Sequence, residues 1–364
     1  MLSVWCGANR FEHCEITRHD AVLKRLFGFA RMANFKAVMR LFNKFTQSTN
    51  DAVMDSLYRW MFGQISINGI TLDLDSTVMT RYGSQEGAVR GYNPAKRGRA
   101  SHHPLMAFVA DTRMIANCWL RPGNSASANN VQAFLASTLH RLGDKRVALL
   151  RADSGFSDSA FLDHLDQQQL HHIIALRQNQ PLQRALVNTQ DWWVLHEDNG
   201  KPVVGIELTR FAYQANTWSR PRWVIGIRQH IEQRAQPKGK TVSLFADDPV
   251  IGQWRFSALV TDLDLPAVAI WRMYRGRADC ENRIKELKYD FAADSFNMKN
   301  FWATEAALNT VMLAYNLLSL LRQVLLKPVR SSIHPIRSST RYKRCVTSCL
   351  QKLHTSRQKA ENRS

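Results

Sequence analysis

Long apolar runs and an export signal are both missing from this sequence. The most hydrophobic window, residues 306–321, is interrupted by Asn309, Asn316 and Ser319 and is closed by Arg322. This window is too short and too polar for a membrane-spanning helix, and it predicts a buried core helix instead. The first residues show no charged start followed by an apolar stretch, so they do not resemble a signal peptide. We therefore expect no membrane partner.

Cysteine is also scarce. The six cysteines show neither Cys-x2-Cys spacing nor the density of a disulfide scaffold. Cys6, His13 and Cys14 look like half of a zinc site, but no second pair follows at ligand spacing. This usage favours a reduced chain located in the cytoplasm.

Acidic residues are few compared with basic ones. The 364-residue chain has 49 Lys and Arg against 30 Asp and Glu, which gives a formal charge of +19. Such a surplus favours a polyanionic partner, because each phosphate contact releases counterions. An anionic membrane surface would also attract it, but membrane-binding stretches gather their basic residues on one amphipathic helix, and here they are spread along the chain. Nucleic acid is the partner that the composition predicts.

Hydrophobic periodicity predicts helices at the start of the chain and a mixed α/β sheet after them. Residues 18–47 predict two helices joined near residues 33–34, and a third helix runs from about Asp51 to Phe62 with its cap among residues 48–50. The following pattern is strand, hairpin, helix, strand, helix and strand, which is typical of an α/β fold. These elements are expected at 65–75, 105–120, 129–142, 146–151, 158–167 and 172–176.

The amino-acid composition changes after residue 178. Residues 179–264 are rich in Thr, Val, Trp and Tyr and are broken at 199–200 and 237–239, which predicts a β-rich insertion. A helical pattern resumes at about Ala267.

Three carboxylates stand at positions that would let them meet. Asp75 ends one predicted strand, Asp153 follows another, and Glu281 lies on the late helix. They converge if both strands lie centrally in one sheet, and hard oxygen ligands of this kind suit Mg²⁺. Strand-end aspartates are more often caps or turn residues, so this placement is weak evidence on its own.

The helix around Glu281 strengthens the case. Tyr274, Arg277, Glu281 and Lys288 are spaced by 3, 4 and 7 residues, which places them within about 60° on one continuous helix. A carboxylate flanked by a hydroxyl, a guanidinium and an ammonium suits a site that holds metal and grips phosphates. A solvated helix face with ordinary ion pairs is the alternative, but it does not explain the tyrosine.

This spacing, Tyr-x2-Arg-x3-Glu-x6-Lys, resembles the YREK signature of bacterial insertion-sequence DDE transposases of the cut-and-paste type. Further blocks resemble one such family in the same order, and together they span about residues 70–320. The blocks are LDLDST at 72–77, GYNPAKRGRASHHPL at 91–105, RADSGF at 151–156, RFSALVTDL at 255–263 and ENRIKELK at 281–288.

The resemblance implies an RNase H-like catalytic core in which Asp75, Asp153 and Glu281 bind two Mg²⁺ or Mn²⁺ ions. It also implies that Tyr274, Arg277 and Lys288 contact phosphates at the transposon end. The partners would be transposon-end and target DNA, with a homodimer formed on the DNA. Asp73, two residues before the first triad member, is expected to have a supporting role.

Other residues have less decided roles. Relatives hold a flipped base against an insertion-domain tryptophan, for which the candidates are Trp192, Trp193, Trp218 and Trp223. We place His102 and His103 in the basic loop with Lys96, Arg97 and Arg99, where phosphate contact and simple solvation are both open.

The expected division of the chain has five parts. Residues 1–64 form a helical segment, interpreted as a truncated DNA-binding region, and 65–178 form the first part of the core. Residues 179–264 are the insertion, 265–326 complete the core, and 327–364 are a basic tail with ten Lys or Arg against one acid. This tail is either disordered or the product of a shifted reading frame. Three functions remain open: an active transposase, a non-catalytic DNA-binding fragment that inhibits transposition, and an RNase H-fold nuclease. The signature and the insertion argue against the nuclease.

Overall fold

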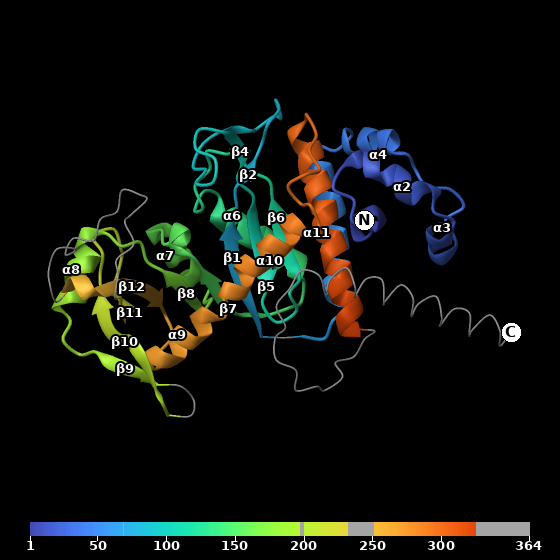
Figure 1. The fold of residues 1–364 in the computed structure, drawn as a ribbon. Helices are drawn as coiled ribbons and strands as arrows, with labels where there is room; N and C mark the ends of the chain where they lie inside the picture. Colours follow the sequence, from blue (N-terminus) through green and yellow to red (C-terminus); the bar gives the residue numbers. More distant parts are fainter. Residues whose placement is uncertain (68, 197–199, 232–250, 325–364) are drawn as a thin grey trace.

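A nine-stranded sheet with helices on both faces organises the molecule (Figure 1). The computed structural model describes residues 1–67, 69–196, 200–231 and 251–324. The breaks expected at residue 199 and at 237–239, and the basic tail, lie outside these residues. No helix in the described ranges is long and apolar enough to cross a bilayer.

The N-terminal helices differ in their limits from the expectation. The Asp20 carboxylate accepts hydrogen bonds from the amides of Val22 and Leu23, which divides the first expected helix in two. The third expected helix starts at Gln47 rather than Asp51, because the Thr46 hydroxyl accepts a hydrogen bond from the Thr49 amide and so caps the helix. The elements are α1 (Leu2–Trp5), a 3₁₀ turn (Phe11–His13), α2 (Cys14–His19), α3 (Ala21–Phe27), α4 (Phe35–Phe42) and α5 (Gln47–Gly63).

Five strands form the first part of the sheet, and two helices lie between them in the sequence. They are β1 (Ile70–Ser76), β5 (Leu105–Val109), β6 (Ile115–Trp119), α6 (Val131–Leu142), β7 (Val147–Ala152), α7 (Ser159–Gln167) and β8 (His172–Ala175). The strand order is β6-β5-β1-β7-β8. β1 pairs antiparallel with β5 and parallel with β7, which in turn pairs parallel with β8. The mixed α/β sheet is therefore confirmed, and its strand order matches the RNase H-like core that the resemblance implies.

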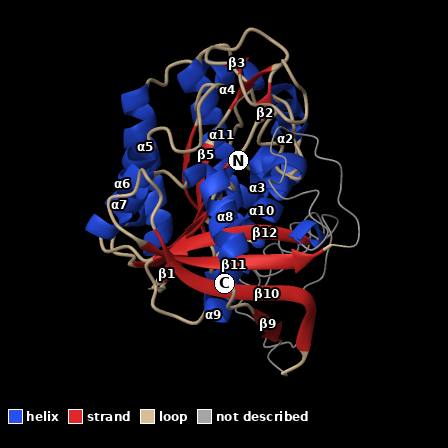
Figure 2. Ribbon diagram, turned by 90° about the vertical axis from the view of Figure 1, so that its left-hand side faces the viewer, coloured by secondary structure: helices blue, strands red, loops and turns tan. Residues whose placement is uncertain are grey.

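The later strands extend the same sheet. Its order continues as β8-β12-β11-β10-β9, and every one of these pairs is antiparallel. Figure 2 shows β10, β11 and β12 as long neighbouring arrows. An unexpected helix, α8 (Gln180–Asn188), precedes them; its signals are the Asn179 cap and a proline in the first turn. The strands are β9 (Trp193–His196), β10 (Pro202–Tyr213), β11 (Arg222–His230) and β12 (Trp254–Thr261).

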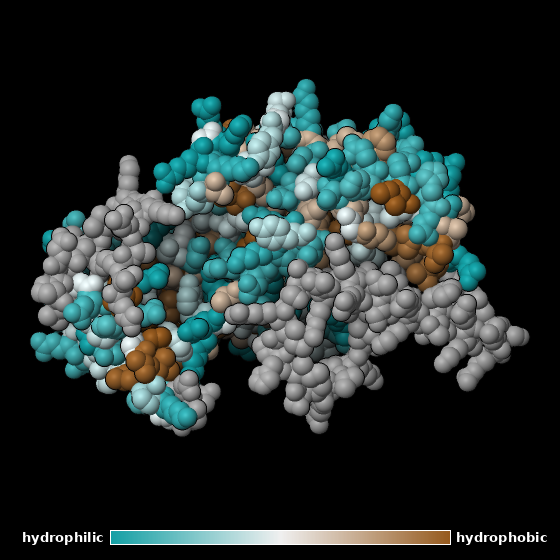
Figure 3. Space-filling view, in the orientation of Figure 1, coloured by the Kyte–Doolittle hydropathy of each residue, from teal (hydrophilic) through white to brown (hydrophobic). Residues whose placement is uncertain are grey.

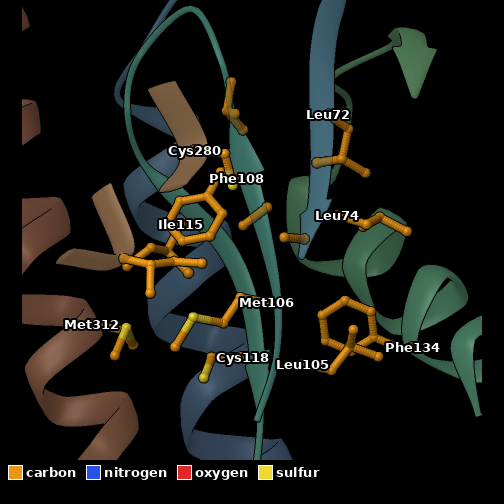
Figure 4. Close-up of a cluster of buried hydrophobic side chains, with 14 of the residues drawn as sticks. Leu72, Leu74, Leu105, Met106, Phe108, Ile115, Cys118, Phe134, Cys280 and Met312 are labelled. Atoms are coloured by element: carbon orange, nitrogen blue, oxygen red, sulfur yellow. The ribbon is translucent and has the colours of Figure 1, made fainter. Parts of the chain in front are cut away.

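Side chains of β1 and β5 alternate between two buried layers (Figure 4). One layer faces α6, and the other faces α10 (Ala278–Tyr289) and α11 (Phe301–Val324), which follow α9 (Ala267–Arg275). Because Leu72 and Leu74 point to the α6 side, alternation turns Asp73 and Asp75 toward α10. The first layer contains Leu72, Leu74, Leu105 and Phe134; the second contains Met106, Phe108, Ile115, Cys118, Cys280 and Met312.

A small three-stranded sheet lies at the opposite end from β9–β12 (Figures 1 and 2). It has the order β2-β4-β3, with β2 at Met79–Thr80, β3 at Val89–Arg90 and β4 at Ala100–His102. His102 and His103 are buried here, so of the two interpretations left open for them the solvated loop is wrong, and phosphate contact stays a prediction. The ring of His102 accepts a hydrogen bond from Arg81 Nε at 3.0 Å, and the ring of His103 bonds the carbonyl of Ser125 at 2.8 Å.

Candidate active site

Asp75 and Asp153 are neighbours because of strand register. β1 and β7 run parallel, and Leu74 pairs with Ala152. Each aspartate directly follows its member of that pair, so the two stand at the same edge of the sheet. Adjacent strands lie about 4.8 Å apart, which is close enough for the two carboxylates to influence each other.

Asp75 is a buried carboxylate with one cationic partner. Its Oδ1 accepts the Ser76 amide at 2.7 Å, and its Oδ2 lies 3.1 Å from Arg277 Nη2. The pKa of Asp75 is raised to about 6: burial is the largest cause, Arg277 lowers the pKa, and the charges of Asp153 and Glu281 raise it. A raised pKa of this origin indicates negative charge that the protein alone does not fully neutralise.

Asp153 is fixed by the turn that follows it. Its Oδ1 accepts the Gly155 amide at 2.8 Å and caps a 3₁₀ turn at Ser154–Phe156. A Cβ on Gly155 would lie 2.7 Å from Ser127 Oγ and 2.9 Å from Asp153 Oδ1. Ser127 Oγ also lies 2.9 Å from Ser76 Oγ. The loop that carries Ser127 therefore packs against both aspartate-bearing turns.

Glu281 is exposed on α10 and still close enough to act on Asp75. Within the described ranges its carboxylate has no hydrogen bond or ion pair. Burial is the largest cause that raises the pKa of Tyr274; Arg277 lowers it, and the charges of Asp153, Asp75 and Glu281 raise it. The Tyr274 hydroxyl donates to the Ala152 carbonyl at 3.4 Å. Asp75, Asp153 and Glu281 are therefore near enough for the charges of the other two to act on Asp75, and their role as a metal-binding triad stays a prediction.

The single continuous helix expected through this region was wrong. α9 ends at Arg275 and α10 begins at Ala278. Between them, the Arg277 amide bonds the carbonyl of Tyr274 and the Cys280 amide bonds that of Arg277, both at i to i−3 spacing. A tighter turn of this kind changes the angle between successive side chains. The 60° stripe therefore does not describe how these residues are placed. Arg277 and Lys288 contact the end of β1 and the residues after it, and Tyr274 contacts the last residue of β7.

Arg277 and Lys288 both contact the end of β1. Arg277 is buried and donates to the Leu74 carbonyl at 3.2 Å, in addition to its pair with Asp75. Lys288 Nζ donates to Thr77 Oγ1 at 2.6 Å and to the Val78 carbonyl at 2.9 Å. Burial lowers the pKa of Lys288. In the protein alone these cations hold the strand that carries Asp75, and their contact with phosphates stays a prediction.

Asp73 has the supporting role that its position suggested. It is fully buried and pairs with Arg151 through two hydrogen bonds of 2.6 and 2.8 Å. Arg151 also donates to the Met273 carbonyl on α9. The pair therefore joins β1, β7 and α9 just below the acids.

Sequence reasoning missed Arg121. Its Nη1 donates to the carbonyls of Ala126, Ser127 and Asn129, and its Nε donates to the His103 carbonyl at 3.1 Å. It is buried and shapes the loop that contacts both aspartate turns. No local signal marks this role, because an arginine that bonds backbone carbonyls looks in sequence like any other basic residue.

The tryptophan candidates of the insertion divide by exposure. Trp218 is buried, whereas Trp193 and Trp223 are 55% and 41% exposed. Trp223 stacks with the Arg210 guanidinium, 4.0 Å from the ring centroid. Burial argues against Trp218 as a base-holding residue, and the choice among the others is open.

The carboxylate oxygens of Asp75, Asp153 and Glu281 suit a hard divalent cation, although the side chains are not positioned to bind one. Three carboxylates supply oxygen ligands, and their mutual repulsion raises the pKa of Asp75. Among the described residues, however, no group of three His, Cys, Asp or Glu side chains is arranged to hold a metal ion. Asp75 is paired with Arg277, and exposed Glu281 has freedom to move. Side-chain rearrangement is therefore required before these acids share an ion.

A protein family matches nearly the whole chain. Its model, described as "Transposase DDE domain group 1", matches residues 1–337. Among solved structures, the chain is similar to one described as a piggyBac transposase synaptic complex with hairpin DNA, at 14% identity and a TM-score of 0.40. The similarity covers 80% of this chain and 54% of that one, so this chain spans about half of its length. No curated protein matches.

Proposed function

The chain belongs to the transposase DDE domain group 1 family, and from that premise we propose that it cuts DNA at the ends of a mobile element and joins the freed 3′ ends to target DNA. The observation that best supports this proposal is that Asp75 and Asp153 stand at the ends of two paired parallel strands, with Glu281 near enough for its charge to act on Asp75. Two of these acids stand side by side on parallel strands, and the third lies on a separate helix. A metal-dependent phosphodiester site requires converging carboxylates, and we propose that side-chain rearrangement completes this convergence here.

Asp75, Asp153 and Glu281 are the residues that would hold two Mg²⁺ or Mn²⁺ ions. When bound, such ions activate an attacking oxygen and stabilise the leaving oxygen. Arg277 balances the charge of buried Asp75 and keeps the end of β1 in place. Tyr274, whose hydroxyl bonds the Ala152 carbonyl, and Lys288, which bonds the two residues after β1, are the candidates for contacting the phosphates that flank the scissile bond.

The proposed partners are transposon-end DNA and target DNA. The formal charge of +19 supports a polyanionic partner of this kind. We propose further that the chain acts as a homodimer on DNA, because the two ends of an element must be held together during excision. The free cysteines fit a reducing compartment such as the cytoplasm.

The test compares Glu281→Gln with the unmutated protein on a plasmid that carries the ends of the encoding element. Nicking in Mg²⁺ or Mn²⁺ should fall by about 100-fold or more, because the substitution removes a ligand charge without adding bulk. Affinity for end DNA should stay within about twofold, since Glu281 contacts phosphate only through metal. Calorimetry should also show weaker Mn²⁺ binding by the variant.

Asp144→Asn is the matched control, because Asp144 is a carboxylate with an 83% exposed side chain remote from these acids in the sheet. This variant should nick normally. If the unmutated protein binds end DNA but never nicks it, and Glu281→Gln behaves identically, the chain is instead a non-catalytic DNA-binding fragment.

A further inference from the structure

The small sheet carries an exposed surface that is both basic and aromatic. We define the basic platform as Tyr82, Arg90, Tyr92, Lys96 and Arg99, all of them exposed. The two tyrosines are 67% and 73% exposed. Within residues 82–99 the only acid is Glu86, whose carboxylate accepts the Phe301 amide at 2.9 Å. The surface over this sheet, at the upper edge of Figure 3, is mostly hydrophilic.

Contacts within the platform fix its side chains and loops. Lys96 Nζ bonds the Tyr82 hydroxyl and lies 4.9 Å from the ring centroid, while the Arg99 guanidinium lies 5.7 Å from the same ring. Beneath them, buried Asn93 donates to Thr80 Oγ1 and accepts the Lys96 amide, each at 3.0 Å. The loop is thus ordered before any ligand binds, which lowers the entropy cost of binding.

At two glycines the backbone of the platform packs closely against the rest of the molecule. A Cβ on Gly87 would lie 2.6 Å from the Phe301 ring at the start of α11. A Cβ on Gly91 would lie 2.0 Å from the carbonyl oxygen of Gly123, in the loop after β6. Only glycine fits at these contacts. The platform is therefore held by α11 and by the loop that also carries Ser127.

The platform lies a short chain distance from the acids. Only Thr77 and Val78 separate β1 from β2, and Lys288 bonds both of them. Tyr82 is seven residues beyond Asp75, so the two Cα atoms are at most about 25 Å apart, because an extended chain spans roughly 3.5 Å per residue. At 3.4 Å per base pair, this reach corresponds to about seven base pairs of duplex.

We propose that the basic platform binds the sugar-phosphate backbone of duplex DNA beside the scissile phosphate, within its first seven base pairs or so. This inference rests on the proposed function and names the surface that would receive its DNA. Arg90, Lys96 and Arg99 supply the phosphate contacts, and the two exposed tyrosines supply hydroxyl donors and flat surfaces against the sugars. Contacts of this type position DNA and do not read its sequence.

The test removes three charges from the platform and, in a second protein, three from elsewhere. The platform variant is Arg90→Gln, Lys96→Gln and Arg99→Gln; the control is Arg59→Gln, Arg184→Gln and Arg255→Gln, at exposed positions on α5, α8 and β12. The platform variant should reduce the salt dependence of end-DNA binding by about 2–3 units of slope, since each phosphate contact contributes about 0.9. Hydroxyl-radical protection should be lost only over the first seven or so base pairs.

The control variant should leave that protection intact. Equal changes in slope for the two variants, or protection lost only beyond about ten base pairs, would overturn the platform. Melting curves of both proteins establish that each is folded. The outcome is separable from that of Glu281→Gln: failure of nicking leaves a DNA-binding platform testable by protection alone, and a failed platform leaves the metal-dependent test unaffected.

Discussion

At the scale of single residues, Arg277 is notable because it is buried against the carboxylate proposed to bind metal. The side chains of Arg277 and Asp75 are 7% and 9% exposed. The prediction that Arg277 contacts phosphate came from its place in a motif. A motif does not reveal which residue the arginine pairs with in the absence of DNA. The structure adds a second role, charge compensation for Asp75, that operates before DNA binds.

Arg277→Met should destabilise the metal-free protein by roughly 3 kcal/mol, because it leaves Asp75 buried without its cation. Adding Asp75→Asn should recover part of that loss. The measurement is a denaturant-unfolding cycle of the four proteins in the presence of a chelator. Additive effects of the two substitutions would show that there is no coupling energy between Arg277 and Asp75.

Glu305 offers a pH-dependent test at a position remote from the acids. Burial raises its pKa to about 7, and its Oε1 accepts the Leu120 amide at 3.0 Å. Because the folded-state pKa lies above the ordinary 4.5, the stability contributed by this group is present below pH 4.5 and is lost as the pH rises through 7. Glutamine keeps the acceptor and cannot ionise.

Glu305→Gln should therefore melt about 2–5 °C higher than the unmutated protein at pH 8, with a smaller difference at pH 5. Glu12→Gln, at an exposed position, serves as the control and should show no such pH dependence. A difference between Glu305→Gln and the unmutated protein that is the same at both pH values would mean that Glu305 does not ionise near neutrality in the folded protein.

At the scale of elements, the turn after β7 and the loop after β6 act as one unit. Gly155, Ser127 and Ser76 come from three segments and lie in direct contact. The spacing of the aspartates thus depends on a residue, Ser127, that lies on neither of their strands.

Gly155→Ala should lower nicking by roughly 10- to 100-fold, because a Cβ displaces Ser127 and Asp153 by a fraction of an ångström or more. Gly63→Ala is the matched control, since nothing lies within 4 Å of its Cβ position at the end of α5. That variant should be as active as the unmutated protein. Full activity of Gly155→Ala would show that the contact does not set the spacing of the acids.

Elements were predictable from sequence where their cause is local. Strict alternation indicated β1, and an apolar run indicated β7, so both aspartates were placed correctly at strand ends. The division between α9 and α10 was not predictable. A Cβ on Gly276 would lie 2.7 Å from Arg151 Nη1. The contact that requires a glycine at this division is therefore made with a residue 125 positions away in the chain.

At the scale of the whole molecule, one sheet connects the core and the segment interpreted as an insertion. β8 pairs with β7 on one side and with β12 on the other. Composition indicated that residues 179–264 are rich in strands, but strand composition does not reveal which edge they join. The burial of His102 and the bonding of Arg121 were hidden for the same reason, because their partners come from other segments.

The interior position of β1 and β7 has a consequence for how the molecule opens. Both strands are hydrogen-bonded on both sides, so their amides should exchange with solvent only when the sheet itself unfolds. Glu281 follows the break between α9 and α10, where short i to i−3 bonds replace regular helical ones. The two aspartates therefore lie at the ends of strands whose amides exchange slowly. Glu281 lies on α10, which can open locally before the sheet unfolds. We therefore expect the conformational changes that bring the three acids together to occur in α10.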